Sequence, residues 1–186
     1  MAIRFVSVIV LLLSAACTAP TRDLTEEIAP IGNFRLGQLV PRAEVQLAKG
    51  PLSRSASSEE WMLAIDEAFT ERLSRFEGGS YYHLGITVGG YVLAKPGIPF
   101  FAGPKSILIF TVILVEDHMG KVLTEEPHQI TVIERLTGGS ILGLGFTRSR
   151  AQQMRDLSEQ AARKTEDWLR KQAWFDGPDT IFIFHR

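Results

Sequence analysis

The sequence predicts an α+β fold, an antiparallel sheet of four to five strands with two helices packed on one face. Two segments, 57–78 and 149–172, repeat their apolar residues every three or four positions, which is typical of amphipathic helices. Three segments, 81–94, 106–117 and 121–134, alternate in polarity or are continuously apolar, as strands are. Two helices on one face of an antiparallel sheet satisfy this order of elements.

Each early element has a local signal of its own. The segment Phe34 to Leu47 alternates weakly and contains Pro41, which favours an edge or bent strand. The helix that follows starts with the capping box Ser57-x-x-Glu60, and Gly78-Gly79 is expected to end it. The strand over 81–94 has one apolar face, so we expect one buried side.

The segment 106–117 is the strongest strand, because both of its faces are apolar. We therefore expect a central strand covered on both sides. A turn at Asp117 to Gly120 returns the chain into the strand 121–134, with a break at Pro127. The long second helix has an apolar stripe that includes Met154 and Leu157. Its opposite face is charged: Arg155, Asp156, Glu159, Arg163, Lys164, Glu166 and Arg170. The residues Thr180 to Arg186 are a candidate for one more short strand.

The N-terminus carries the most specific motif of the chain. Arg4 precedes an apolar run over 5–13, and small residues at 14–16 lead to Cys17, the only cysteine. This order is the secretory pattern, and the apolar run is too short to span a bilayer. The motif resembles the lipobox of bacterial lipoproteins, in which the cysteine is acylated and becomes the mature N-terminus. Leucine here stands four residues before the cysteine instead of three, and an ordinary secretion signal cut near Ala16 is the alternative.

This resemblance implies a signal peptide over 1–16, a flexible tether over 17–30 and a single α+β periplasmic domain over 31–186. It implies attachment to the membrane through a lipid on Cys17. Thr18, in place of the aspartate that retains lipoproteins at the inner membrane, implies a location in the cell envelope at the outer membrane, facing the periplasm. The layout is also similar to uncharacterised lipoprotein families of alphaproteobacteria and to small periplasmic auxiliary proteins, such as the lipopolysaccharide-assembly lipoprotein and the amino domain of the Tol translocation protein. Such resemblances imply a fold and a place, and no reaction.

Composition and motifs argue against several functions. The chain has 20 Lys plus Arg against 21 Asp plus Glu, so we expect no nucleic acid partner. Acylation of Cys17 would leave no thiol for metal or redox chemistry. The histidines, His83, His118, His128 and His185, belong to no metal-binding motif, and no G-x-S-x-G elbow is present. We expect no metal, no cofactor and no catalysis, and hence a lipid-anchored envelope protein with a structural or binding role. The alternative is a lipoprotein subunit of a transport system that handles lipid or an apolar solute between sheet and helices.

Two glycine-containing loops form the candidate contact surface. The loops 97–103 and 138–145 flank antiparallel strands, so they should lie at the same end of the sheet. That end would carry apolar side chains bordered by two arginines: Phe100, Phe101, Ile141, Leu142, Leu144, Arg148 and Arg150. Such a surface suits an anionic lipid or an envelope protein partner with acidic groups. The alternative is that the loops cover each other.

The two arginines lie where a helix begins, and the helix dipole disfavours cations there. We expect compensation from Asp156 or Glu159, or a bound anion. The ordinary interpretation is a solvated arginine pair. The second loop matches neither a P-loop nor a dinucleotide-binding fingerprint.

Overall fold

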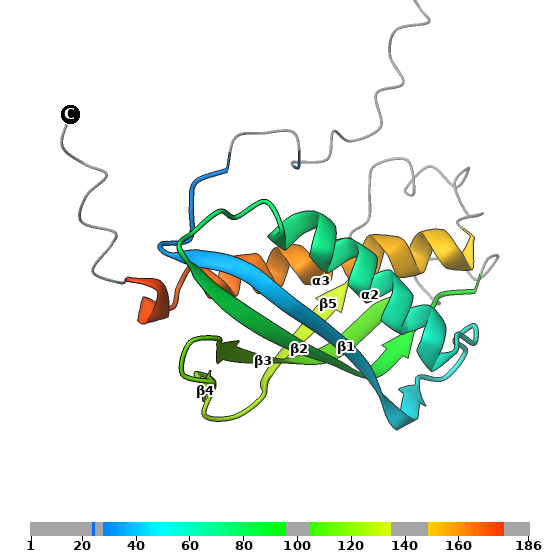
Figure 1. The fold of residues 1–186 in the computed structure, drawn as a ribbon. Coiled ribbons are helices and arrows are strands. Elements are labelled where there is room, and N and C mark those ends of the chain that lie inside the picture. The colour runs from blue at the N-terminus through cyan, green and yellow to red at the C-terminus, as the bar shows by residue number, and fades with distance from the viewer. Residues whose placement is uncertain (1–23, 25–27, 96–104, 135–148, 177–186) are drawn as a thin grey trace, which may run out of the picture.

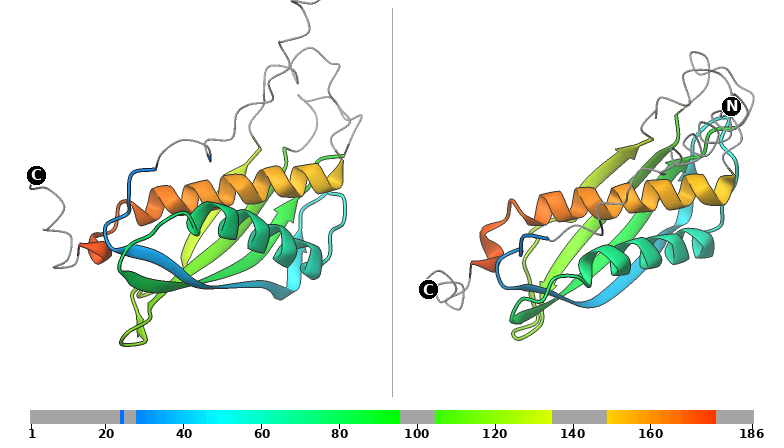
Figure 2. Two further views of the ribbon diagram at one scale, coloured as in Figure 1. Left: turned by 45° about the horizontal axis from the view of Figure 1, so that its top comes forward. Right: turned by 90° about the horizontal axis from the view of Figure 1, so that it is seen from above.

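The computed structural model describes Leu24 and residues 28–95, 105–134 and 149–176. The elements follow in this order: β1 (Phe34–Lys49), α2 (Ser58–Leu73), β2 (Ser80–Val92), β3 (Ile107–Glu116), β4 (Lys121–Val122), β5 (His128–Ile133), α3 (Arg150–Leu169) and the short 3-10 helix η3 (Ala173–Phe175). Both helices lie on one face of a five-stranded sheet (Figures 1 and 2). The predicted α+β fold with two helices on one face is confirmed.

The sheet is mixed, because one of its strand pairs is parallel. β3 runs antiparallel to β2, β4 and β5, whereas β1 runs parallel to β2. The sequence predicted antiparallel pairing throughout. The reason for the difference is α2, which carries the chain from the end of β1 back to the level at which β2 starts, so that both strands run in the same direction. The break at Pro127 separates β4 from β5, which pair with β3 one after the other.

The domain has two ends, which position every site discussed below. At the tether end, Ile28 to Phe34 lead into β1, and α3 finishes near them, with Phe175 accepting a hydrogen bond from the Asn33 amide at 2.9 Å. At the loop end, β2 and β5 finish and β3 and α3 start. Figure 1 shows the two ends on opposite sides of the molecule.

The core lies between the helices and one face of the sheet. The β3 side chains on that face, Leu108, Phe110, Val112 and Leu114, are fully buried, and Trp61, Ile65 and Phe69 of α2 cover them with equal burial. The opposite face of β3 is partly open, with Ile109 37% exposed. The expectation that β3 is covered on both sides is therefore wrong for the described residues, because both helices pack on the same face.

The first helix starts as predicted and ends earlier than predicted. Both hydrogen bonds of the capping box between Ser57 and Glu60 are present, but α2 finishes at Leu73. Gly78 lies beyond the end of the helix, where it packs against the backbone of Asn33. A Cβ there would lie 2.2 Å from the carbonyl carbon of Asn33, so the close approach of the two backbones requires glycine.

Candidate functional site

The loop end is where the sequence predicted a contact surface. Cys17, Phe100, Phe101, Ile141, Leu142, Leu144 and Arg148 lie outside the described residues. The residues that flank the two loops do meet. The Glu134 amide donates to the Ser106 carbonyl at 2.8 Å, and the Ala94 amide donates to the Ser106 hydroxyl at 3.2 Å. Both loops therefore start and finish at one end of the sheet, as the predicted surface requires, and the contact itself stays a prediction.

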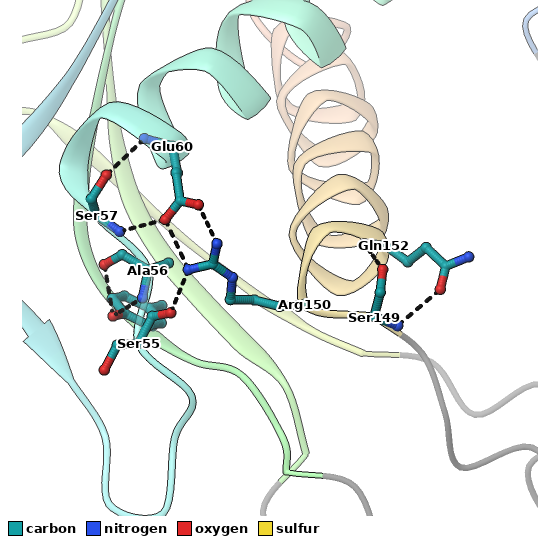
Figure 3. A network of polar contacts seen from close by, with 8 residues as sticks. Ser55, Ala56, Ser57, Glu60, Ser149, Arg150 and Gln152 are labelled. Carbon is teal, nitrogen blue, oxygen red and sulfur yellow. Dashed lines mark hydrogen bonds and ion pairs between the residues drawn. The ribbon is translucent and has the colours of Figure 1, made fainter.

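Arg150 is the predicted contact residue that the structure describes. Its guanidinium makes a two-pronged ion pair with the Glu60 carboxylate, with one Nη1 to Oε2 distance of 2.9 Å, and donates to the Ser55 carbonyl at 2.8 Å (Figure 3). The first turn of α3 contains no acidic residue. For Arg150, a compensating charge comes from Glu60 of the other helix, and compensation of the arginine pair by Asp156 or Glu159 stays a prediction.

A second arginine, Arg54, interacts electrostatically with Arg150, and no pattern in the sequence indicates it. The Arg54 guanidinium donates to the side chain of Gln153, and its backbone amide donates to the Leu93 carbonyl at 2.9 Å. Burial lowers the pKa of Arg54 below its ordinary value, the charge of Arg150 lowers it further, and Glu134 opposes the change. The loop end thus holds two neighbouring guanidinium groups, one of which comes from a segment with no periodic pattern.

A groove of about 400 Å³ runs between α2 and α3 near the loop end. Its apolar lining includes Leu63 of α2, which is 72% exposed, and Met154 of α3. Arg155 spans it, with ion pairs to Glu159 at 3.2 Å and to Glu67 at 3.5 Å. This groove lies between the helices, whereas a carrier of apolar solutes would use a space between helices and sheet, where the fully buried core side chains lie.

The tether end is organised around a buried carboxylate. Glu166 pairs with Arg72 at 2.7 Å, and their side chains are only 10% and 8% exposed. Glu166 also pairs with Arg170 at 2.7 Å. Arg170 in turn donates to the carbonyls of Ala29 at 2.8 Å and Pro30 at 3.3 Å. These contacts fasten the chain that leads into β1 onto the end of α3.

His83 and Asp117 form the one described pair that resembles catalytic machinery. The His83 Nδ1 accepts from the Gln38 amide at 2.9 Å, so Nε2 carries the proton and donates to Asp117 Oδ1 at 2.7 Å. Both ring nitrogens are therefore occupied, and neither offers a lone pair to a substrate. The pair joins β1 to β2 and to the turn after β3.

The other described histidines have different surroundings. His128 stacks on Trp168 with ring centres 4.6 Å apart, and the backbone amide of His118 donates to the Glu116 carboxylate. His185 lies outside the described residues. Within the described ranges, no three His, Cys, Asp or Glu side chains come together to hold a metal, and no helix is long and apolar enough to cross a membrane.

Comparison with known proteins found solved structures that are similar to this chain at low sequence identity. No family model matches the chain, and no curated protein matches it. A Xanthomonas campestris protein of the DUF330 family is similar at 12% identity, with 77% of this chain and 87% of that chain covered and a TM-score of 0.42. A putative lipoprotein from Caulobacter crescentus is similar at 13% identity, with 71% of this chain and 87% of that chain covered and a TM-score of 0.36. A minor lipoprotein from Acinetobacter baumannii is similar at 15% identity over 70% and 92%, with a TM-score of 0.31.

Proposed function

We propose that this chain is a lipid-anchored protein of the bacterial cell envelope with a structural or binding role and no catalysis. Acylation of Cys17 holds it to the outer membrane, and the domain faces the periplasm. The observation that carries the proposal is the fastening of Ala29 and Pro30 by Arg170, because it fixes where an N-terminal anchor joins the domain. The segment from Cys17 to Ile28 reaches at most about 40 Å when fully extended. The anchor thus joins the domain at the tether end, and we place this end nearer the membrane.

The loop end then faces away from the membrane. The 20 residues of α3 run from the loop end to the tether end and span about 30 Å. This separation favours a protein partner over the lipid surface as the occupant of the loop end.

The charges at the loop end indicate the chemistry of that partner. Cations outnumber carboxylates among its described residues: Lys49, Arg54, Lys95, Lys105 and Arg150 against Glu59, Glu60 and Glu134. An envelope protein with an acidic surface suits this excess, and the apolar loop residues Phe100 and Phe101 would add contact area.

The anchor is tested by fractionation of cells that produce the full chain. The wild type should take up labelled palmitate and sediment with outer membranes, and Cys17→Ala should do neither. Thr18→Asp is the matched variant, because it keeps the acylated cysteine and should move the protein to the inner membrane. Membrane sedimentation of Cys17→Ala, together with no palmitate on the wild type, would contradict the proposal.

The contact surface is tested with the double variant Phe100→Ser and Phe101→Ser. We expect a chemically cross-linked partner to be lost from this variant while palmitate labelling persists. Met119→Ser is the control, because Met119 is 73% exposed in the turn at the tether end and should retain the partner. Equal cross-linking in the double variant and the control would show that the loop end is not the contact surface.

A further inference from the structure

The outer face of the sheet, which the helices leave uncovered, collects most of the exposed apolar side chains. Residues directly opposite on neighbouring strands point to the same face. The register therefore places Val40, Tyr81, Ile109, Val122 and Ile133 on this outer face. These are five of the eight large hydrophobic residues that are exposed in the described structure, with exposures from 37% to 55%.

The rows of paired residues show that β2 and β3 contribute no charged residue to the middle of this face. One row joins Val40, Gly85 and Ile113, and the next joins Arg42 of the edge strand β1 to Thr87, Thr111 and Gln129. Towards the loop end, Val92, Ile107 and Ile133 form an aliphatic row. A smooth aliphatic and threonine surface of this kind is typical of a face that another sheet covers.

Gly85 adds an independent observation. A Cβ at Gly85 would make only ordinary contact with Ile113, at 3.8 Å, so packing within the chain does not require glycine there. Glycine inside a strand often marks a place where another backbone comes close. Gly85 lies in the middle of the outer face, where that backbone would belong to a partner.

The size of the face agrees with a specific interface. The ten residues of β3 span about 34 Å, and four columns of strands span about 19 Å, which gives on the order of 600 Å² per copy. Stable interfaces bury about 600 to 1,000 Å² per partner. The outer face is therefore large enough for a dimer, and covering it would remove the exposed aliphatic surface.

We propose that two copies of this chain pair through the outer face of the sheet, with the two-fold axis parallel to the strands. Such an axis sets the β1 margin of one copy over the β4–β5 margin of its partner, and it sets the two tether ends side by side. The direction of the axis rests on the proposed function, because two copies anchored in one membrane need their tether ends together.

The charges at the two margins agree with this axis. Within the sheet, the β1 margin carries Arg35 and Arg42 against Glu44. The segment from β4 to β5 carries Glu125 and Glu126 against Lys121, and Lys164 of α3 reaches the Thr131 carbonyl beside it. The strand segments at the two margins therefore differ in the sign of their net charge, and the axis brings them together. An axis across the strands would set each margin against its own copy.

The dimer is tested by cross-linking variants of the full chain in intact cells with a short bismaleimide, each variant carrying one cysteine in addition to Cys17. On a strand-parallel axis each residue of β3 lies close to its own copy, so Ile107→Cys, Thr111→Cys and Val115→Cys should all give a band at twice the monomer mass. On an axis across the strands only the central Thr111→Cys would do so, because Ile107 and Val115 are about 27 Å apart along β3.

Two controls make the outcome specific. Leu63→Cys lies on the helix side and is more accessible than the partly buried β3 positions, at 72% exposed. It should give no dimer, and neither should the parent chain with Cys17 alone. Adding Ile109→Lys to Thr111→Cys should abolish the band while the thermal melting midpoint, followed by circular dichroism, stays close to that of Thr111→Cys. If Ile109→Lys does not fold, Ile133→Lys takes its place, because Ile133 is 50% exposed.

The result that supports the inference is a dimer band from all three β3 variants and from neither control. No band, a band from Thr111→Cys alone, or cross-links only to other proteins would overturn it. The outcome is separable from the anchor. Bands that persist in a Cys17→Ala background would support the dimer independently of the lipid. An acylated chain that gives no bands would support the anchor and contradict the dimer.

Discussion

Glu166 is the carboxylate that joins the two helices at the tether end, through ion pairs with Arg72 and Arg170. Its position in the second helix groups it with the charged, solvent-facing side chains, yet it is 8% exposed. Arg72 from the last turn of α2 and Arg170 from α3 enclose it. A buried carboxylate of this kind depends on its cationic partners, and Arg72 lies 94 positions away in the chain. Helical periodicity carries no information about a partner at that distance.

We expect Glu166→Gln to lower the free energy of unfolding by about 3 to 5 kcal/mol, because it leaves a buried guanidinium without its opposing charge. Glu159→Gln is the matched control in the same helix. Glu159 pairs with Arg155, whose side chain is 51% exposed, so its loss should cost less than about 1 kcal/mol. Urea denaturation measures both variants, and equal losses would show that burial of the pair does not matter.

The raised pKa of Tyr82 leads us to expect a lower free energy of unfolding at alkaline pH. Burial raises the pKa of its phenol above the ordinary 10.0, and the nearby charge of Glu116 raises it further. Because the folded state holds the proton more tightly than the unfolded state, this contribution is complete below about pH 10 and disappears as the pH rises further.

The free energy of unfolding of the wild type should therefore fall more between about pH 9 and pH 11 than that of Tyr82→Phe. Denaturant titrations at the two pH values measure the difference between the proteins, which cancels the titration of other groups. Parallel losses in the two proteins would contradict a raised pKa for Tyr82.

Among the elements, the position of β3 in the chain was predicted accurately, but the prediction that both of its faces are covered was wrong for the described residues. Alternation and continuous apolarity predicted 106–117, and the strand covers Ile107–Glu116. Because both faces of the strand are apolar, we predicted that other elements would pack on each face. Both described helices pack on the same face. The sequence of a strand records that a face is apolar, whereas the layer that covers it depends on how distant helices pack.

Replacing one residue on each face of β3 tests this asymmetry. Phe110→Ala removes a fully buried ring and should cost about 3 to 5 kcal/mol. Ile109→Ala, at 37% exposure on the outer face, should cost less than half as much when measured at low protein concentration, at which dimer formation contributes little. Similar costs would mean that a layer of the same chain covers both faces.

The path of β1 illustrates a different limit of sequence analysis. Its weak alternation and Pro41 predicted an edge strand, and β1 is the edge strand next to β2. The register shifts between Leu36 and Leu39, where the His83 ring reaches the Gln38 amide. A Cβ at Gly37 would lie 2.7 Å from His83 Nδ1, so this irregularity requires glycine. The irregularity arises from a contact between strands that neither strand encodes alone.

At the scale of the whole molecule, connectivity predicted the candidate site better than residue type did. The antiparallel hairpin was sufficient to bring the flanks of both loops to one end. The ion pair between Arg150 and Glu60 could not be predicted, because Glu60 lies in another helix. The capping box at the start of α2 is by itself a sufficient reason for a glutamate at position 60. The described part of the site thus combines an order of elements that can be predicted with side-chain pairs that cannot.

The proposed orientation can be measured on the acylated protein in lipid vesicles that contain a quenching lipid. A fluorophore on Lys171→Cys, beyond the end of α3, should be quenched more strongly than one on Lys95→Cys, at the loop end. Both lysines are exposed, so labelling should leave the fold intact. Stronger quenching at position 95 would place the loop end at the membrane.

The fastening of Ala29 and Pro30 by Arg170 also determines how the domain bears mechanical load. A pull between an N-terminal anchor and a partner at the loop end acts along β1 and α3, from one tip of the domain to the other. The hydrogen bonds between the parallel strands β1 and β2 lie across that direction, so many of them carry the force together instead of opening one after another. A domain held in this way resists tension most strongly along the line that joins its two attachments.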